Sequence, residues 1–255
     1  MKLRDVVHSE SFAKARQPIG MRYIVRPLSW IFAWVVIKCG ASANLVTFCR
    51  LLITALIFTG MIAWPDQLNI LIVLFILVGV LGTAVDGCVS RAKNESSYFG
   101  KYFDGFVDSI TEVTFYTVLA ISLSYLEVDK SLILFGVIGS LSLHVFQSGG
   151  IRHQIIEQLM IIDGHKKNEL ISGSFFKWIW TFIGQDAPLH LWDIRYGGFI
   201  VGLYLESLET YLIIICLLQM VHALGFVPLR LIVSYRLINK YKLSASASSL
   251  LRDNR

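Results

Sequence analysis

The chain has 255 residues, of which 55% are hydrophobic and 16% are charged, and its mean hydropathy is +0.62. Because soluble domains carry about 25% charged residues, this composition excludes an ordinary soluble domain and predicts an integral membrane protein. The formal net charge of +5 fits a basic surface that faces anionic lipid, so it gives no reason to expect a nucleic-acid partner.

We expect three regions along the chain. Residues 1–28 read as a basic cytoplasmic leader, because mixed polar residues precede the first apolar stretch and no small-residue cleavage site follows. Residues 29–238 are predicted to form one membrane domain, and residues 239–255 a polar cytoplasmic tail.

The membrane domain is expected to be all-α, with six transmembrane helices. Apolar windows long enough to cross a bilayer cover residues 45–63, 68–90, 102–124, 131–150, 190–206 and 209–235. The fifth window has the least apolar start, where Asp193 and Arg195 lie. Two shorter apolar stretches, 29–39 and 171–183, are predicted to be interfacial helices that lie along the membrane surface.

The distribution of charge predicts the orientation of these spans. Lysine and arginine gather before the first span, between the second and third, after the fourth and after the sixth. The acidic residues of the opposite connections are Asp66, Glu127, Asp129, Glu206 and Glu209. The positive-inside rule therefore places both termini and residues 86–108 in the cytoplasm, and we expect a bacterial inner membrane.

Residues 86–108 combine several charged residues with apolar spans on both sides. Asp104 and Asp108 are four apart, so they share one face of a helix, and Gly100 extends that face by one turn. Asp86 ends the preceding span, and a short polar turn returns the chain, so three carboxylates should converge at the cytoplasmic boundary. Because a charge at membrane depth is costly, this cluster predicts a functional site.

Three neighbouring carboxylates repel one another unless a cation lies between them. Mg²⁺ prefers oxygen ligands and is commonly shared with substrate phosphates. Arg91 adds a planar donor group suited to phosphate oxygens, and Gly87 lets a substrate lie close to the backbone. These parts predict phosphoryl-group transfer on a diphosphate. The alternative, that each residue is a solvated helix end or an ordinary cytoplasmic charge, explains the joint pattern on two adjacent helices less well.

This segment resembles the signature of the CDP-alcohol phosphotransferase family, D-x-x-D-G-x-x-A-R-x(8)-G-x-x-x-D-x-x-x-D. The positions that match in type and spacing are Asp86, Gly87, Arg91, Gly100, Asp104 and Asp108. Upstream, residues 43–50 (ANLVTFCR) look like that family's P-N-x-x-T-x-x-R motif, with alanine in place of proline. Six spans after an interfacial helix also fit, so the resemblance covers most of residues 20–235.

The resemblance implies an enzyme that splits a CDP-linked donor, passes its phospho-alcohol group to a hydroxyl and releases CMP. Asp86, Asp104 and Asp108 would hold one or two Mg²⁺ or Mn²⁺ ions, and Asp108 would also be the general base that deprotonates the acceptor. The residues that would frame the CDP moiety are Gly87, Ser90, Arg91 and Gly100. Members of the family often form homodimers, so we expect one here.

The donor and the acceptor are not fixed by any residue of the sequence. We favour CDP-diacylglycerol as donor and a small polar alcohol as acceptor, which would make phospholipid headgroups. A soluble CDP-alcohol that modifies a lipid hydroxyl is the other possibility.

One position departs from the family signature. The first aspartate falls at Thr83, a neutral residue whose hydroxyl is a poorer metal ligand, while Ser90 replaces alanine and is a mild change. Thr83 could be an engineered substitution, a natural variant with altered metal use, or the mark of a catalytically inactive relative that binds nucleotide or lipid without turnover. A transporter is a further alternative. Two features argue against it: the charges gather on one side of the membrane, and the spans show no repeat symmetry.

Other polar residues lie in or beside the spans. Arg50, a few residues into the first span, either contacts phosphate or snorkels towards the headgroups. Arg152 and Arg195 could line the acceptor side of the cavity, where two arginines would favour an anionic acceptor. Glu112 continues the face of Asp104 and Asp108 and could substitute as a ligand, although it lies deeper.

Two pairs of polar residues are predicted to make interhelical hydrogen bonds and to take no part in chemistry. They are His144 with Gln147 in the fourth span, and Gln219 with His222 in the sixth.

Overall fold

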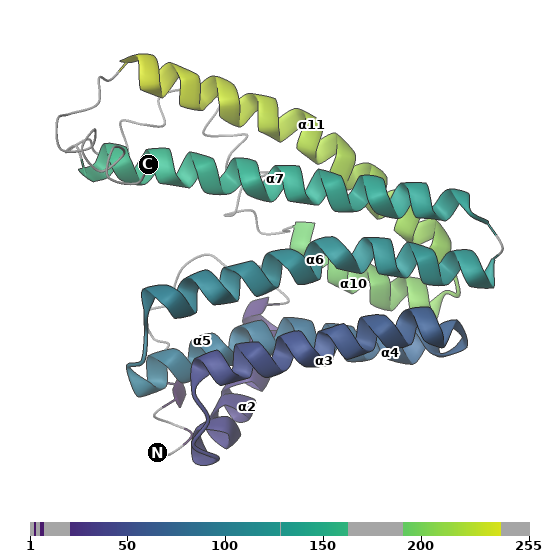
Figure 1. Cartoon of the computed structure of the whole chain (residues 1–255), viewed down its shortest axis with the longest axis horizontal. Coiled ribbons are helices and arrows are strands. Elements are labelled where there is room, and N and C mark those ends of the chain that lie inside the picture. The colour runs from purple at the N-terminus through teal and green to yellow at the C-terminus, as the bar shows by residue number, and fades with distance from the viewer. Residues whose placement is uncertain (1–2, 4–5, 8–20, 128, 163–190, 241–255) are drawn as a thin grey trace.

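A computed structural model describes residues 3, 6–7, 21–127, 129–162 and 191–240 of the chain (Figure 1). All regular structure in these residues is helical, as the sequence predicts. The elements are η1 (Met21–Val25), α2 (Arg26–Lys38), α3 (Ala43–Ala63), η2 (Pro65–Gln67), α4 (Leu68–Phe75), η3 (Ile76–Leu81), α5 (Gly82–Lys93), α6 (Tyr98–Leu126), α7 (Ser131–Ile162), α10 (Leu191–Tyr204) and α11 (Leu208–Lys240).

Five helical segments in the described residues are long and apolar enough to cross a membrane. They are Ala43–Ala63, Pro65–Lys93, Tyr98–Leu126, Ser131–Ser148 and Leu208–Leu229. The sequence predicts one more span, the fifth in chain order, at 190–206; the described part of α10 there has 14 residues, which is short for a hydrocarbon core of about 30 Å. The protein is an integral membrane protein with five candidate spans among its described residues, and the count of six stays a prediction.

The remaining differences concern where helices begin and end. α2 covers most of the stretch 29–39 that was expected to be an interfacial helix, and it begins three residues earlier, at Arg26, with a proline in its first turn. α7 runs 12 residues past the expected end at 150, because nothing requires a helix to stop at the membrane boundary. The second expected interfacial helix, 171–183, lies outside the described residues.

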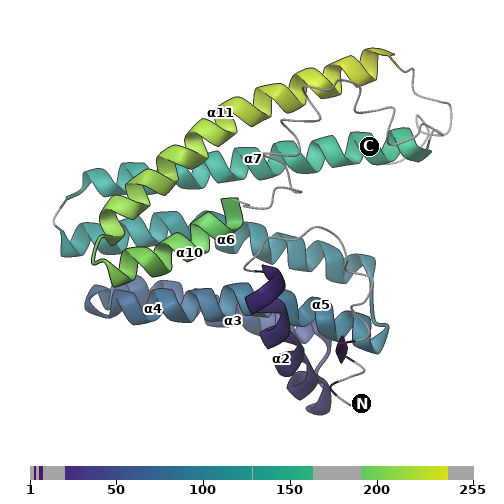
Figure 2. The same ribbon diagram turned by 180° about the vertical axis from the view of Figure 1, so that it is seen from behind.

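The helices form three layers that can be followed in Figures 1 and 2. α7 and α11 lie side by side, α6 packs between α7 and α3, and α5 packs beside α3. α2 crosses the end of α5 and contacts it through Ser29 and Cys88. The second span, from Pro65 to Lys93, contains the π-helical segment η3 just before α5. Such wider turns are frequent at functional sites.

The apolar core lies towards the end of the bundle where α3 meets α4. Phe75 stacks on Phe115 with ring centroids 4.1 Å apart, and Phe199 of α10 packs edge-on against Phe115. α6 and α7 approach closely at Gly136, where an added methyl group would overlap Ala120 and the carbonyl oxygen of Tyr116. Small residues at such contacts let transmembrane helices pack tightly.

We expect Gly136→Ala to destabilise the protein by about 1–3 kcal/mol, because the added methyl group meets backbone that cannot move aside. Gly225→Ala in α11 is the matched control, since nothing lies within 4 Å of its added carbon. That change should be neutral or stabilising by up to about 1 kcal/mol, because alanine is the better helix former. Thermal unfolding in detergent compares the two, and equal effects would contradict close packing of α6 on α7.

Candidate active site

The site is built where α3, α5 and α6 meet at the end of the bundle opposite the aromatic core (Figure 1). α3 begins after Ser42, whose hydroxyl accepts a hydrogen bond from the Leu45 N–H at 3.3 Å. Asn44, Thr47 and Arg50 follow at intervals of three, so they lie along one face of α3. All three contact or closely approach residues of α5 or α6.

The turn between α5 and α6 brings the aspartates of the two helices together. α5 ends at Lys93, and its C-cap residue Asn94 adopts the left-handed conformation with φ 55°. Ser97 caps α6 by accepting a hydrogen bond from the Gly100 N–H at 3.0 Å. Lys93 Nζ donates to the Ala41 carbonyl at 2.9 Å, which ties the end of α5 to the α2–α3 connection. The polar turn that the sequence predicts therefore holds the start of α6 beside the end of α5.

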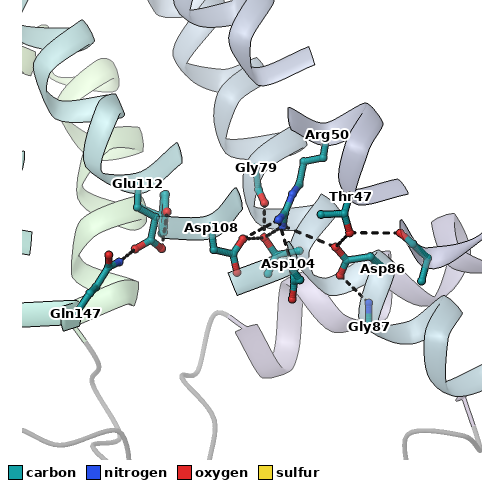
Figure 3. A network of polar contacts seen from close by, with 12 residues as sticks. Thr47, Arg50, Gly79, Asp86, Gly87, Asp104, Asp108, Glu112 and Gln147 are labelled. Atoms are coloured by element: carbon teal, nitrogen blue, oxygen red, sulfur yellow. Dashed lines mark hydrogen bonds and ion pairs between the residues drawn. The ribbon is translucent and has the colours of Figure 1, made fainter. Parts of the chain in front are cut away.

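Arg50 lies among the three predicted aspartates (Figure 3). Its Nη2 is 2.8 Å from Asp108 Oδ1 and 3.1 Å from Asp104 Oδ1, and its Nη1 is 4.0 Å from Asp86 Oδ2. Arg50 is only 4% exposed, so its guanidinium points into the carboxylate cluster and not towards lipid headgroups. One cation of the chain itself thus connects all three carboxylates.

Hydrogen bonds from α3 and α5 hold the inner part of the cluster. Thr47 Oγ1 donates to Asp86 Oδ2 at 2.7 Å, and the Gly87 N–H donates to Asp86 Oδ1 at 2.6 Å. The Thr83 hydroxyl accepts a hydrogen bond from Arg50 Nη1. Its own proton can go to the Gly79 carbonyl at 2.8 Å or to Asp108 Oδ1 at 3.0 Å.

The three carboxylates differ in their access to solvent. Asp86 is 3% exposed and fully hydrogen-bonded within the bundle, whereas the side chains of Asp104 and Asp108 are each 35% exposed. A ligand that approaches this end of the protein can therefore reach Asp104 and Asp108 more readily than Asp86.

The family comparison agrees with this arrangement. The model of the CDP-alcohol phosphatidyltransferase family matches residues 41–161, a range that holds the whole cluster. Residues 41–161 form a CDP-alcohol phosphatidyltransferase domain. Neither the comparison with curated proteins nor the comparison with solved structures gave a match.

The matched family suggests a general chemistry for the part of the chain that holds the cluster. The family's name describes the transfer of a phosphoalcohol from a CDP-alcohol to an acceptor alcohol, so the match suggests transferase chemistry for residues 41–161. The upstream motif and the carboxylate motif of the CDP-alcohol phosphatidyltransferase domain form one unit, because Arg50 and Thr47 of the first contact Asp86, Asp104 and Asp108 of the second.

Two glycines of the domain make room for this contact. A Cβ atom at Gly82 would lie 2.6 Å from Arg50 Cδ and 3.0 Å from Arg50 Cγ, so glycine gives the arginine its path across α5. A Cβ atom at Gly100 would lie 2.9 Å from Asn44 Oδ1, so glycine lets α6 approach α3. In this structure both residues serve helix packing around the cluster, whatever else Gly100 does for a substrate.

The family resemblance implies a divalent cation at this site. Three carboxylates are the right donors for Mg²⁺ or Mn²⁺. Their arrangement does not fit, because no group of three His, Cys, Asp or Glu among the described residues is placed to hold a metal ion, and the Arg50 guanidinium lies against Asp104 and Asp108. In this arrangement Asp104 Oδ1 and Asp108 Oδ1 are in contact with Arg50.

A second polar network lies one helical turn deeper than Asp108. Gln147 of α7 donates to Glu112 Oε2 at 2.8 Å and accepts a hydrogen bond from the Ser109 hydroxyl at 2.9 Å, and the Tyr196 hydroxyl lies 3.4 Å from Glu112 Oε1. Glu112 thus extends the carboxylate face of α6, but its oxygens face α7 and α10 (Figure 3). This confirms the predicted interhelical hydrogen bond of Gln147.

The other predicted site residues are those expected to contact the CDP moiety and the acceptor. Ser90 and Arg91 lie on α5 near its end, where the Ser90 hydroxyl contacts that of Ser96 at 3.2 Å and the Arg91 guanidinium lies over Gly87. Arg152 and Arg195 fall on α7 and α10, but their side chains lie outside the described part of the structure. Their roles, like those of the aspartates, stay predictions.

Sequence reasoning missed Thr47 and Gly82 as parts of the site and left the role of Arg50 open. Thr47 and Arg50 carried a signal, because both occupy fixed positions of the upstream motif. Gly82 carried none, since a lone glycine before Thr83 gives no indication that a side chain from another helix crosses it.

Proposed function

We propose that the chain is an enzyme that transfers a phospho-alcohol group, in the favoured case phosphatidyl, from a CDP-linked donor to an acceptor alcohol and releases CMP. The main support is the convergence of Asp86, Asp104 and Asp108 with Arg50 at one end of the spans, with Asp104 and Asp108 partly open to solvent. This is where a diphosphate from the cytoplasm and a lipid in the bilayer could meet.

The reaction needs one proton transfer and one displacement. Asp108 takes the proton of the acceptor hydroxyl, and the acceptor oxygen forms a bond to the phosphorus that carries the alcohol group. The bond from that phosphorus to the bridging oxygen breaks, and the bridging oxygen leaves with CMP. The Arg50 guanidinium lies beside Asp104 and Asp108, where its positive charge can stabilise negative charge that develops on the phosphate oxygens.

Substrates, cofactor and assembly belong to the same proposal. We propose CDP-diacylglycerol as donor, a small polar alcohol as acceptor and a role in phospholipid headgroup synthesis. Mg²⁺ or Mn²⁺ is the proposed cofactor, with Asp86, Asp104 and Asp108 as the donors in an arrangement that differs from the one described here, where Arg50 lies against Asp104 and Asp108. The protein would be a homodimer in a bacterial inner membrane with both termini and the site in the cytoplasm, and Arg152 and Arg195 would contact an anionic acceptor.

Thr83 supports one competing proposal. In place of the first carboxylate of the signature, this chain offers a neutral hydroxyl that contacts Arg50 and Asp108. A relative that has lost a metal ligand in this way would bind CDP compounds but release no CMP.

A CMP-release assay separates the two proposals. The purified full chain is incubated with Mg²⁺ or Mn²⁺, CDP-diacylglycerol or a panel of soluble CDP-alcohols, and candidate acceptors; Thr83→Asp is tested in parallel. We expect release by the unaltered chain, and the productive pair would name the substrates. CDP binding without release, together with release by Thr83→Asp, would mean that Thr83 inactivates an otherwise intact site. CDP binding without release in both proteins would favour the non-catalytic relative.

A further inference from the structure

The side-chain amide of Gln147 on α7 binds α6 at two points within one turn of Asp108. Its oxygen accepts a hydrogen bond from the Ser109 hydroxyl at 2.9 Å, and its Nε2 donates to Glu112 Oε2 at 2.8 Å. Ser109 directly follows Asp108, and Glu112 lies about one turn further along α6. Exchange of the amide oxygen and nitrogen would set the oxygen of Gln147 against an oxygen of Glu112, so only one orientation of the amide satisfies both bonds.

A third helix holds the same carboxylate. The Tyr196 hydroxyl of α10 donates to Glu112 Oε1 at 3.4 Å, so Glu112 has hydrogen-bond donors on α7 and on α10 (Figure 3). Hydrogen bonds to a charged group are roughly twice as strong as those between neutral groups. Because a carboxylate within a membrane span is costly without such partners, the network favours one rotation of α6 about its axis.

The rotation of α6 decides which of its side chains reach Arg50. Asp104 and Asp108 contact Arg50 Nη2 at 3.1 and 2.8 Å. Successive residues of a helix are about 100° apart, so even a partial turn of α6 would move both carboxylates off the guanidinium. A misplacement of about 1 Å can lower a reaction rate roughly a hundredfold.

A second α6–α7 contact lies much further from Asp108. The hydroxyls of Thr117 and Ser140 are 2.7 Å apart, and Thr117 is about two and a half turns further along α6 than Asp108. The two contacts therefore join the same pair of helices, but that of Gln147 lies beside the carboxylate cluster and that of Thr117 does not.

We propose that Gln147 is a positioning residue for the reaction: with Ser109 and Glu112 it fixes the rotation of α6 and so holds the Asp108 carboxylate at Arg50. This inference rests on the proposed function, which makes Asp108 the general base. The proposed steps use no atom of Gln147, so Gln147 acts on the rate only through Asp108.

A kinetic double-mutant cycle tests this dependence on the purified full chain. Gln147→Leu removes both hydrogen bonds at similar side-chain size, and Thr117→Val is the matched control, because it removes the other α6–α7 hydrogen bond. We expect Gln147→Leu to lower the rate of CMP release roughly ten- to a hundredfold and Thr117→Val to leave it nearly unchanged. In Asp108→Asn, Gln147→Leu should add little, whereas a mere loss of folded protein would lower both rates by the same factor.

Variants of Ser109 keep the test decisive if Gln147→Leu does not fold. Ser109→Ala loses the hydroxyl that donates to the Gln147 amide, so it should lower the rate and depend on Asp108 in the same way. Ser109→Thr keeps a hydroxyl and should restore most of the rate. Equal rates in the two Ser109 variants, or a loss from Gln147→Leu that is as large in Asp108→Asn as in the unaltered chain, would overturn the proposal.

Thermal unfolding in detergent separates this inference from the proposed function. Arg50→Met removes the guanidinium, and it should lower the Tm less in combination with Gln147→Leu or Ser109→Ala than with Thr117→Val, because α6 then no longer presents its carboxylates to residue 50. That result without CMP release from any protein would support the positioning role and refute the enzyme. Equal decreases in Tm in all these combinations would overturn the positioning role, whether or not CMP is released.

Discussion

Asp108→Asn is expected to lower the rate of CMP release by at least about a hundredfold while the protein remains folded. A positioned general base contributes roughly 10²–10⁴ to a rate, and an amide cannot take up the acceptor proton. The fold should survive because asparagine has the same shape, and its carbonyl oxygen can still accept a hydrogen bond from Arg50 Nη2, now 2.8 Å away. The measurement is CMP release under saturating donor, together with thermal unfolding in detergent.

Asp129→Asn is the matched control for this prediction. Asp129 lies in the connection between α6 and α7, outside the candidate spans, and its side chain accepts hydrogen bonds from the Ser131 N–H at 2.8 Å and hydroxyl at 2.9 Å. These bonds hold the pKa of Asp129 below its usual value, so it is an ionised carboxylate at neutral pH, as a control requires. The control should keep its rate of CMP release, and a normal rate in Asp108→Asn would remove Asp108 from the role of base.

The sequence predicted the part of the site that depends on helical spacing. Asp104 and Asp108 lie on one face of α6 because they are four residues apart, and Gly100 precedes them by one turn as expected. The turn before α6 follows from Asn94 and Ser97, residues that favour helix ends. These features depend only on residues that are near one another in the chain, so they can be predicted from a single sequence.

The sequence did not predict that Arg50 contacts the carboxylates, because this contact depends on how the helices pack and not on residue spacing within one helix. Whether Arg50 reaches Asp108 or the lipid headgroups is set by the rotation of α3 about its axis and by the room at Gly82. Both follow from contacts between helices that are far apart in the sequence.

The position of Arg50 beside Thr83 gives a physical reason for a neutral residue at position 83. A carboxylate at position 83 would be a fourth anion around one guanidinium, and a cluster of that charge would depend on metal to stay together. With a hydroxyl there, Arg50 and hydrogen bonds from Thr47 and Gly87 can stabilise the remaining carboxylates. The change at Thr83 and the central position of Arg50 are therefore consistent with each other, and they predict a site that is stable before metal binds.

Arg50→Met should accordingly be the most destabilising single change in the site, by about 3–5 kcal/mol in the presence of EDTA. Methionine fills a similar volume, so the loss reflects charge: the three carboxylates that Arg50 contacts would face one another without a cation, and Asp86 is only 3% exposed. Removing one partner of a buried ion pair typically costs this much. Thermal unfolding in detergent, with and without a chelator, is the measurement.

Arg22→Met is the control. Arg22 is exposed and its guanidinium lies over the ring of Tyr23, so its loss should change stability by no more than about 0.5 kcal/mol. Mg²⁺ provides the second comparison. If a divalent ion and Arg50 use the same oxygens, Mg²⁺ should restore most of the stability that Arg50→Met loses, and it should stabilise the unaltered chain much less, because binding there must first displace the arginine. A loss below about 1 kcal/mol in EDTA would mean that the carboxylates do not depend on Arg50. A full loss that Mg²⁺ leaves unchanged would mean that the arginine balances their charge in a place that no divalent ion takes over.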